Sequence, residues 1–464
     1  MDNGSQLCGR WRLHGSLNPA AEMSTDESSQ TEAEVAARIE RDGIRTVRML
    51  LPDLHGVPRA KQVTSAWFAG ILTTGHAYAT PLLSVDLLQD YDESRHLLMD
   101  NGQLIPDLGT FAVLPWRPST AHVVCDFTRH GAEGPTPRAA LRRVEAAAGA
   151  LGYAPVIGNE SEFYVFRADD PGYSSEVGMR EWFSDLALGK RAAFLDDLHI
   201  YLPALGVPVY EIFNEHGAGQ MEANLLPGPA LERADQVFVM KAAIKEIALL
   251  HGLKATFMTK PANFEEVATS GYHLHHSVLD RHGENVFRPG EGADELSETG
   301  MQYLAGQLAH APALTAMAAQ TITAYKRYRP GTYAPTSAGW LLEDRGSLAR
   351  LILAGANTRI ENRLGASDAN PYLLAASQIA AGLDGIKNRL KAPLSDPSAH
   401  TGSVTTPLPG NITDAARALA DDAVLREALG SELVDDYCSM LCHVAQRFQS
   451  WVTDWEIREY REVL

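Results

Sequence analysis

The chain has 464 residues and a formal charge of −18 at pH 7, with 45% hydrophobic and 21% charged residues. This length predicts a globular protein of two or three domains. The excess of acid argues against nucleic acid and anionic membranes as partners, because both bind basic patches. No apolar run is long enough to span a bilayer, and the N-terminus lacks the order of a signal peptide. The four cysteines are too few and too scattered for a disulfide framework, so we expect a cytoplasmic protein.

The N-terminal part predicts a small β-rich domain behind a disordered leader. Residues 1–30 are rich in Ser, Asn, Gly and acid and show no apolar periodicity, which is typical of disorder. The predicted elements after the leader are a helix over 31–40, capped by Thr31, and strands over 46–51, 59–63, 109–115 and 120–126. We therefore predict an N-terminal domain over residues 31–128.

Residues 129–464 predict a larger second domain, which opens with an Ala-rich amphipathic helix over 138–151. The predicted strands lie near 153–166, 208–213, 219–226, 254–258, 271–279 and 357–364, and the longer helices near 190–204, 230–251, 296–319 and 371–388. This mixture predicts an α+β fold in which several strands present polar residues to one common face. The tail, Ser431–Leu464, is predicted helical. There Trp451 and Trp455 stand at positions i and i+4, a packing stripe and a candidate oligomer contact.

Two carboxylates stand two residues apart at the head of a strand pattern, in Gly158-Asn-Glu160-Ser-Glu162-Phe. Residues i and i+2 of a strand point to the same face, so Glu160 and Glu162 enter the same space. Like charges so close need a cation, a shared proton or solvent around them. Alone, the pair is typical of the exposed face of an edge strand. Similar pieces downstream favour a metal site.

Two of these pieces supply further ligands. The glycines of Gly217-Ala-Gly219 allow a tight reversal across which Glu215 and Glu222 face each other, although on this motif alone a hairpin with surface acids is the better explanation. The stretch around His273-Leu-His275 places two imidazoles on one strand face. Sites dominated by oxygen ligands with one imidazole suit Mg²⁺ or Mn²⁺ better than Zn²⁺.

Arginines are the third element of the pattern. They gather in the segment that also holds Glu361, at Arg327, Arg345, Arg350, Arg359 and Arg363. Arginine is the usual choice for bidentate contacts with phosphate and carboxylate. Without a neighbouring site these would be surface residues. Beside a magnesium-type site they predict bound ATP and an anionic co-substrate.

Together these motifs resemble the glutamine synthetase superfamily over residues 31–464. In the family's order they are Glu160-Ser-Glu162, Glu215…Gly219-Gln-Met-Glu222, Lys260-Pro261…Ser270-Gly-Tyr-His273-Leu-His275, Tyr325-Lys-Arg327…Pro330-Gly331, Arg359-Ile-Glu361-Asn-Arg363 and Asn370-Pro-Tyr372…Gly382-Leu-Asp-Gly-Ile-Lys387. The resemblance implies a β-grasp-like N-terminal domain and a catalytic domain with a curved antiparallel sheet and flanking helices. It also implies self-association as a dodecamer of two hexameric rings, with active sites between subunits.

The resemblance also implies a role for each matching residue, within a site for two or three Mg²⁺ or Mn²⁺ ions. Glu162, Glu215 and Glu222 would hold one ion, and Glu160, His273 and Glu361 another. ATP contacts are implied at His275, Ser277, Arg350 and Arg359, and glutamate contacts at Arg327 and Arg363. Arg345 would contact the phosphoryl group during its transfer from ATP to the γ-carboxylate of L-glutamate. Metals and arginines stabilise the negative charge of such a transition state.

One departure from the family concerns the amine. Where ammonia-using members resemble Pro-Gly-Tyr-Glu-Ala-Pro, this chain reads Pro330-Gly-Thr-Tyr333-Ala-Pro335, so Tyr333 occupies a candidate catalytic position. The N-terminal stretch His76–Ser84 also contains no acid where the family carries its second ammonium-binding carboxylate. Asp86 substitutes for it only if the register slips by several residues.

A site without these carboxylates suits an organic amine, because an aromatic side chain offers apolar packing and cation–π contact. We therefore predict an ATP-dependent ligase that joins glutamate to an arylamine such as aniline, or to a short alkylamine, and resembles γ-glutamylanilide and γ-glutamylalkylamide synthetases. The alternatives are a true glutamine synthetase that uses ammonium, a ligase for polyamines or ethanolamine, and a non-catalytic assembly protein on the same scaffold.

Overall fold

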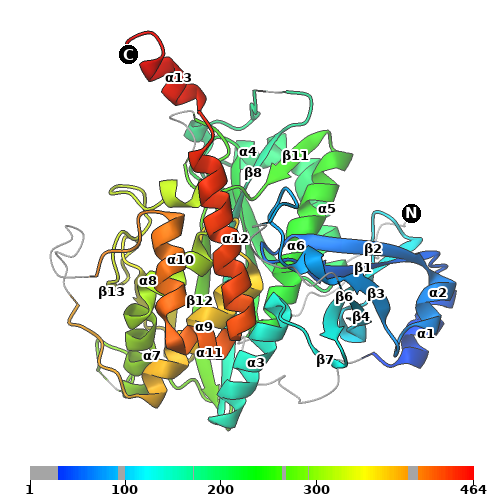
Figure 1. The fold of residues 1–464 in the computed structure, drawn as a ribbon, viewed down its shortest axis with the longest axis horizontal. Coiled ribbons are helices and arrows are strands. Elements are labelled where there is room, and N and C mark those ends of the chain that lie inside the picture. Colours follow the sequence, from blue (N-terminus) through cyan, green and yellow to red (C-terminus); the bar gives the residue numbers. More distant parts are fainter. Residues whose placement is uncertain (1–29, 92–99, 171, 264–267, 291, 396–405) are drawn as a thin grey trace, which may run out of the picture.

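The computed structural model describes residues 30–91, 100–170, 172–263, 268–290, 292–395 and 406–464. All of the predicted leader except Gln30 lies outside the described residues. The described chain forms a smaller β-sheet from its N-terminal part and a larger one from the rest, with helices packed against both (Figure 1). This arrangement confirms the predicted α+β fold.

The smaller sheet has seven strands in the order β2-β1-β6-β4-β3, with β5 and β7 paired to β6. The strands are β1 (Thr46–Pro52), β2 (Pro58–Thr64), β3 (His76–Ala79), β4 (Asn101–Pro106), β5 (Ala112–Val113), β6 (Thr120–Arg129) and β7 (Ala132–Glu133). Two helices, α1 (Glu32–Arg41) and α2 (Ser65–Gly70), add Val35 and Phe68 to its core. The predicted cap Thr31 accepts a hydrogen bond from the backbone N–H of Glu34.

The larger sheet has eight strands in the order β13-β14-β15-β12-β8-β10-β9, with β11 paired to β8. The strands are β8 (Tyr153–Arg167), β9 (Val209–Asn214), β10 (Gln220–Pro229), β11 (Leu253–Thr256), β12 (Tyr272–Asp280), β13 (Trp340–Leu342), β14 (Ala349–Ile352) and β15 (Arg359–Asn362). All pairs are antiparallel except β13 with β14. Strand β8 pairs with β10, β11 and β12 and is therefore the hub of the sheet.

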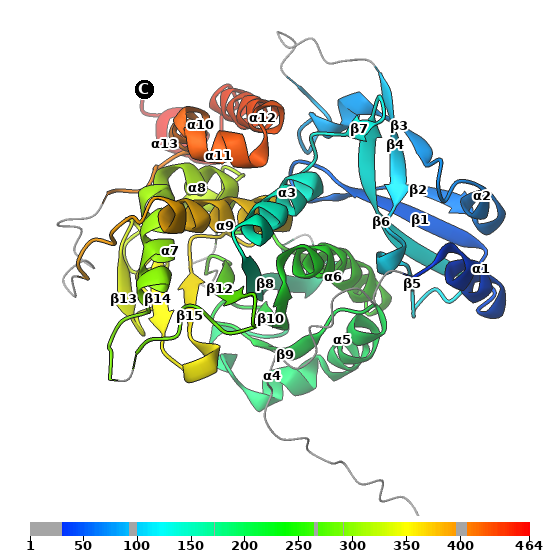
Figure 2. The same cartoon turned by 90° about the horizontal axis from the view of Figure 1, so that it is seen from below.

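Helices fill one side of the larger sheet. The helices of this part of the chain are α3 (Pro137–Ala150), α4 (Asp185–Lys190), α5 (Ala192–Ala204), α6 (Ala230–Leu250), α7 (Glu298–Ala309), α8 (Ala311–Ala318), α9 (Pro371–Lys387), α10 (Ile412–Asp421), α11 (Ala423–Leu429), α12 (Ser431–Gln449) and α13 (Asp454–Tyr460). Figure 2 shows α3, α6 and α9 along this side. Phe163 and Val165 of β8 are buried in the core there, so Glu160 and Glu162, which alternate with them, point to the other face. None of the described helices is long and apolar enough to cross a membrane.

The helix predicted over residues 296–319 is two helices in the structure, α7 and α8, which meet at His310. The break follows from Pro312 in the first turn of α8, because proline has no backbone N–H to bond to the preceding turn. The ring nitrogens of His310 contact Asp422 and Asp384 at 2.6 and 3.2 Å, which fixes the break.

The helix predicted over Ser431–Leu464 is also interrupted. Helix α12 ends at Gln449, and α13 begins behind a capping box in which the side chains of Thr453 and Glu456 accept each other's backbone N–H. Trp451 lies between the two helices, so the predicted i, i+4 stripe with Trp455 is wrong. The two indoles are 71% and 53% exposed, on an end of the chain that projects from the body (Figure 1).

A buried arginine joins the two sheets. Arg138 on α3 is 1% exposed and contacts Asp235 on α6 through two N–O distances of 2.8 and 2.7 Å. It also contacts Asp126 on β6 and Asp107, which precedes β5, at 2.6 Å each. The hydroxyl of Tyr372 donates a further 2.6 Å hydrogen bond to Asp235. One guanidinium thus contacts three carboxylates where the N-terminal part meets the larger sheet.

We expect Arg138→Met to lower the free energy of unfolding by about 3–5 kcal/mol, because it leaves buried carboxylates without their cation. The matched control is Arg142→Met on the same helix, whose more exposed guanidinium also contacts Asp126 at 2.7 Å. It should cost at most about 1 kcal/mol. Urea unfolding followed by circular dichroism measures both. Equal losses for the two variants would contradict the role given to Arg138.

Candidate active site

Three adjacent rows of side chains cross the face of the larger sheet that points away from the helices. Directly opposed residues of antiparallel strands share a face. The first row is Phe213, Glu222 and Glu162, the second is Glu211, Asn224, Glu160 and His273, and the third is Gly158, His275, Glu361 and Arg350. The predicted same-face placement of Glu160 with Glu162, and of His273 with His275, follows from this register.

Three carboxylates crowd together at one end of these rows. Burial raises the pKa of Glu222 to about 9, and the nearby charges of Glu160 and Glu162 add to the rise. Burial likewise raises the pKa of Glu162 to about 7, against the opposing effect of Arg327. The pKa of Glu215 is also raised, again mainly by burial. A divalent ion with oxygen ligands would relieve this repulsion, so the donor set fits Mg²⁺ or Mn²⁺.

A second cluster surrounds Glu160. One ligand atom each from Glu160, His275 and Glu361 lie within 4.8 Å of one another. His273 Nδ1 lies 3.2 Å from Glu160 and 3.6 Å from Glu361. Burial lowers the pKa of His273 to about 4, so its ring is neutral at pH 7, the form that binds metals. His275, predicted as an ATP contact, therefore lies as close to this carboxylate pair as the predicted ligand His273.

Two arginines fix the orientation of these imidazoles. Arg359 Nε donates to His275 Nδ1 at 3.0 Å, so His275 Nε2–H donates to Glu160 at 2.7 Å. Arg327 Nη2 donates to His273 Nε2 at 2.9 Å, so His273 Nδ1–H donates to the other oxygen of Glu160. Although burial opposes it, these two imidazoles hold the pKa of Glu160 well below its usual range.

The remaining predicted arginines lie around Glu361. Arg350 Nη1 contacts one carboxylate oxygen of Glu361 at 3.0 Å, and Arg363 Nη1 contacts the other. The backbone carbonyl of Arg345 accepts a 2.9 Å hydrogen bond from Arg363 Nε, while the Arg345 side chain is exposed. Further along β12, Ser277 donates to the backbone carbonyl of Thr358 at 3.1 Å. The structure thus brings four of the five predicted arginine side chains to the second and third rows.

Tyr333 lies beside this cluster on an exposed loop. Its φ is 53°, its side chain is 67% exposed, and its backbone carbonyl accepts a 3.4 Å hydrogen bond from Arg363 Nη2. Asp86, the sequence's candidate substitute for the missing N-terminal acid, is fully buried and ion-paired with Arg447 of α12. It also accepts backbone N–H bonds from Leu88 and Asp90. The carboxylate of Asp86 is therefore already bound by groups of its own chain.

Sequence reasoning missed Gln220 as a functional residue. Its side-chain Nε2 donates to Glu162 Oε2 at 2.7 Å and to Ser270 Oγ at 3.1 Å. The backbone N–H of Gly271 donates to the same Glu162 oxygen at 2.9 Å. The signal was present in the sequence, because Gln220 stands two residues before Glu222 and therefore shares its strand face.

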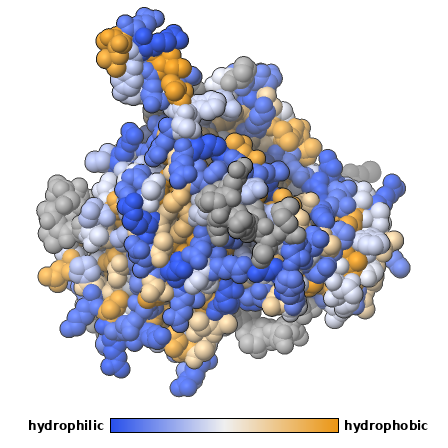
Figure 3. All heavy atoms as spheres, in the orientation of Figure 1, coloured by the Kyte–Doolittle hydropathy of each residue, from blue (hydrophilic) through white to orange (hydrophobic). Residues whose placement is uncertain are grey.

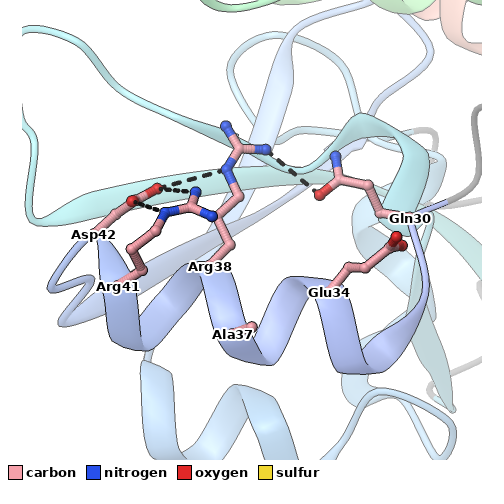
Figure 4. Close-up of a pocket in the computed structure, with 6 residues that line it drawn as sticks. All are labelled: Gln30, Glu34, Ala37, Arg38, Arg41 and Asp42. Atoms are coloured by element: carbon pink, nitrogen blue, oxygen red, sulfur yellow. Dashed lines mark hydrogen bonds and ion pairs between the residues drawn. The ribbon is translucent and has the colours of Figure 1, made fainter.

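A separate hollow of about 510 Å³ lies over the outer side of α1 (Figure 4). It is lined by Gln30, Glu34, Ala37, Arg38, Arg41 and Asp42. None of the predicted site residues line it, and the arginines there are already paired with Gln30 and Asp42. The candidate active site is accordingly the sheet face with the carboxylate rows.

Comparisons with known proteins agree with this fold. The family description "Glutamine synthetase, catalytic domain" matches residues 135–460. The chain is 33% identical over 463 residues to a glutamine synthetase of Halobacterium salinarum, covering 95% of this chain and 99% of the relative. It is 30% identical over 469 residues to a glutamate–isopropylamine ligase of a Pseudomonas species, covering 95% and 100%. A gamma-glutamylethanolamide synthetase of Streptomyces coelicolor is 31% identical over 442 residues, covering 92% and 94%.

Solved structures give the same result. The structure of a GmaS/ADP complex superposes with a TM-score of 0.82 at 30% identity, covering 92% of this chain and 99% of that one. The family match and the relatives named as ligases define a carbon–nitrogen ligase that depends on ATP. The chain belongs to the glutamine synthetase family. It is therefore an enzyme and not a non-catalytic assembly protein on this scaffold.

We expect Glu222→Gln to stabilise the metal-free protein at pH 7 by roughly 1–3 kcal/mol, because Glu222 must take up a proton to be buried in this cluster and a glutamine side chain is neutral already. The same change should abolish most of the stabilisation that Mn²⁺ gives, since a ligand is lost. Thermal unfolding with EDTA and with Mn²⁺ measures both effects. The control is Glu427→Gln, an exposed carboxylate on α11, which should change neither. A Glu222→Gln protein still stabilised fully by Mn²⁺ would argue against this ion site.

Proposed function

We propose that this protein joins the γ-carboxylate of L-glutamate to an organic amine, an arylamine such as aniline or a short alkylamine, through a γ-glutamyl phosphate formed from ATP. The observation that carries the proposal is Tyr333, an exposed aromatic residue where an ammonium-binding glutamate is expected, held next to Arg363. Relatives whose names refer to isopropylamine and ethanolamine support an organic amine.

Metal binding is proposed for the two carboxylate clusters, in a site for two or three Mg²⁺ or Mn²⁺ ions. Glu162, Glu215 and Glu222 would hold one ion. Glu160 and Glu361 would hold another together with His273, with His275 at the same carboxylates as a further candidate ligand. When bound, such ions neutralise the charge of the ATP phosphates and of the transferred phosphoryl group.

The arginines are proposed to bind the anionic substrates. Arg327 and Arg363, only 3% and 4% exposed and joined by a hydrogen bond, form a rigid pair suited to the carboxylates of glutamate. The exposed Arg345 lowers the pKa of Glu215, against the larger effect of burial, which puts its charge beside the ion cluster where the phosphoryl group would pass. Arg350, Arg359, His275 and Ser277, at the other end of the rows, are proposed to contact ATP.

An arylamine substrate needs little help from a general base. A weakly basic arylamine is already neutral near pH 7, so it can attack the acyl phosphate without a carboxylate to deprotonate an ammonium. Its nitrogen forms the amide bond to the γ-carbon as phosphate leaves, and the surplus proton is lost from the nitrogen. Asp86 is ion-paired with Arg447, which supports an amine site without this acid.

The projecting C-terminal end supports self-association. Residues 451–464 expose Trp451, Trp455 and Leu464 to solvent, and Figure 3 shows hydrophobic side chains on this end. Exposed apolar surface of this kind marks interaction sites. We propose that the chain assembles as a dodecamer of two hexameric rings and lies in the cytoplasm. We also propose that it has two domains, over residues 31–128 and 129–464. The small sheet extends to Glu133, five residues past the proposed boundary.

The proposal is tested by phosphate release from ATP with glutamate and Mg²⁺ or Mn²⁺, across ammonium, methylamine, isopropylamine, ethanolamine, putrescine and aniline, with mass detection of the amide. Turnover with aniline or an alkylamine above that with ammonium supports it. Turnover with ammonium alone identifies a true glutamine synthetase, the candidate favoured by the similarity to the Halobacterium enzyme. Preference for ethanolamine or putrescine identifies a ligase for ethanolamine or polyamines.

We expect Tyr333→Glu to shift the ratio of kcat/KM for ammonium to that for the best amine by about tenfold or more towards ammonium, because it restores an anion and removes an apolar surface. Tyr333→Phe keeps the ring and should retain the preference of the natural protein. Steady-state kinetics on both variants measures the ratio. An unchanged ratio in Tyr333→Glu would mean that this side chain does not line the amine site.

A further inference from the structure

We propose that Lys241 is a positioning residue for the carboxylate Glu162. Its ammonium holds the loop of residues 366–370 (the 366–370 loop), and this loop fixes the backbone on which Glu162 stands. The inference rests on the ion site proposed above but not on the identity of the amine.

Lys241 lies on α6 and is buried. Its Nζ donates to the backbone carbonyls of Ser367 and Ala369 at 2.8 and 3.0 Å. The same atom lies over two aromatic rings, 4.9 Å from the centroid of Tyr272 and 5.4 Å from that of Phe257. Two carbonyls and two ring faces thus surround one ammonium beneath the sheet.

The 366–370 loop connects Lys241 to the ion cluster. Ser367 Oγ donates to the backbone carbonyl of Glu162, and Ser367 N–H donates to the carbonyl of Ser270 at 3.1 Å. Gly271, the next residue, accepts from the Glu162 N–H at 3.1 Å and donates to Glu162 Oε2 at 2.9 Å. Both backbone groups of Glu162 and one carboxylate oxygen therefore depend on the position of this loop.

The other end of the loop contacts the N-terminal part of the chain. Asn370 Nδ2 donates to the backbone carbonyls of Asp53 and Leu54 at 3.0 Å each. Gly56, with a φ of +73°, lies so close that a Cβ there would come within 3.0 Å of Pro371 Cδ. The loop is thus packed tightly on both sides, and a shift at one end is transmitted to the other.

A lysine is an unusual choice for this position. Burying an ammonium is unfavourable, and burial lowers the pKa of Lys241 to about 7 although Asp368 favours the charged form. Methionine would fill the space between the rings without that penalty. The contribution that methionine cannot make is the pair of hydrogen bonds to the carbonyls of Ser367 and Ala369.

The test uses the full-length protein and four variants: Lys241→Met, Ser367→Ala, the double variant, and Lys245→Met as a control. Lys245 stands one turn further along α6, over the same Phe257 ring at 5.8 Å, and among the described residues its ammonium has no carbonyl partner in the 366–370 loop. Mn²⁺ binding to each metal-free protein is measured by calorimetry without substrates. The kcat and the KM for glutamate are then measured at saturating ATP and Mn²⁺ with the best amine.

We expect Lys241→Met to weaken Mn²⁺ binding by about 10–100-fold and to lower kcat/KM for glutamate, as loss of a group that orients a metal ligand does. Ser367→Ala should act in the same direction. The double variant should bind Mn²⁺ no more weakly than Lys241→Met within twofold, because both changes break one chain of contacts. Lys245→Met should stay within twofold of the natural protein. A purely structural role would lower the active fraction without changing the Mn²⁺ affinity of folded sites.

Mn²⁺ affinity within twofold of the natural value in Lys241→Met would overturn the inference, as would effects that multiply in the double variant. Should Lys241→Met fail to fold, Ser367→Ala decides, and unchanged Mn²⁺ affinity in that variant overturns the inference as well. A natural protein that binds no Mn²⁺ would overturn both this inference and the proposed ion site. Calorimetry is independent of the amine, so failure of the amine panel alone leaves the role of Lys241 standing.

Discussion

Repulsion between buried carboxylates is the constraint on which the rest of this structure depends. The register of β8 with β10 puts Glu162 directly opposite Glu222, and the register of β8 with β12 puts Glu160 opposite His273. Such a face is unfavourable until cations balance it. Arginines form ion pairs with Glu361 in the third row. At the opposite end burial keeps the pKa values of Glu162, Glu215 and Glu222 raised, although Arg327 and Arg345 oppose the rise for the first two. A divalent ion belongs at that end on electrostatic grounds.

The same constraint explains the rigidity of the surroundings. Each group near the carboxylates is held by a second group behind it, as Arg327 holds His273 and Gln220 holds Glu162. Groups fixed in this way lose little entropy when substrate binds, which is the basis of preorganisation. Tyr333 is the exception, because its side chain is exposed on a loop joined to the cluster through backbone atoms. The residue proposed to select the amine is thus less constrained than these pairs.

Alternation along a strand and the order of the motifs were enough to predict which site residues share a strand face. The pairs Glu160 with Glu162 and His273 with His275 were placed correctly on common faces, because the strand period is two and needs no partner. The register between strands could not be predicted from the sequence. The closeness of His275 to Glu361 and the hydrogen bond from Gln220 to Glu162 therefore came only from the structure. The pairing of Asp86 with Arg447 joins residues 361 positions apart, which no local pattern reveals. Local signals that were present in the sequence went unused, namely Pro312 within a predicted helix and the Thr453…Glu456 capping box.

The distribution of the site along the chain has a consequence for biosynthesis. The rows draw residues from β8, β9, β10, β12, β14 and β15, so the carboxylates Glu160 and Glu361, which are close in space, are separated in the sequence by the strands from β9 to β14. Pairings of such high sequence separation form late in folding. A nascent chain therefore has no complete set of ligands until the segment through Arg363 has left the ribosome. Until then the proposed ion site is incomplete, so the proposed metal-dependent reaction cannot begin on the nascent chain.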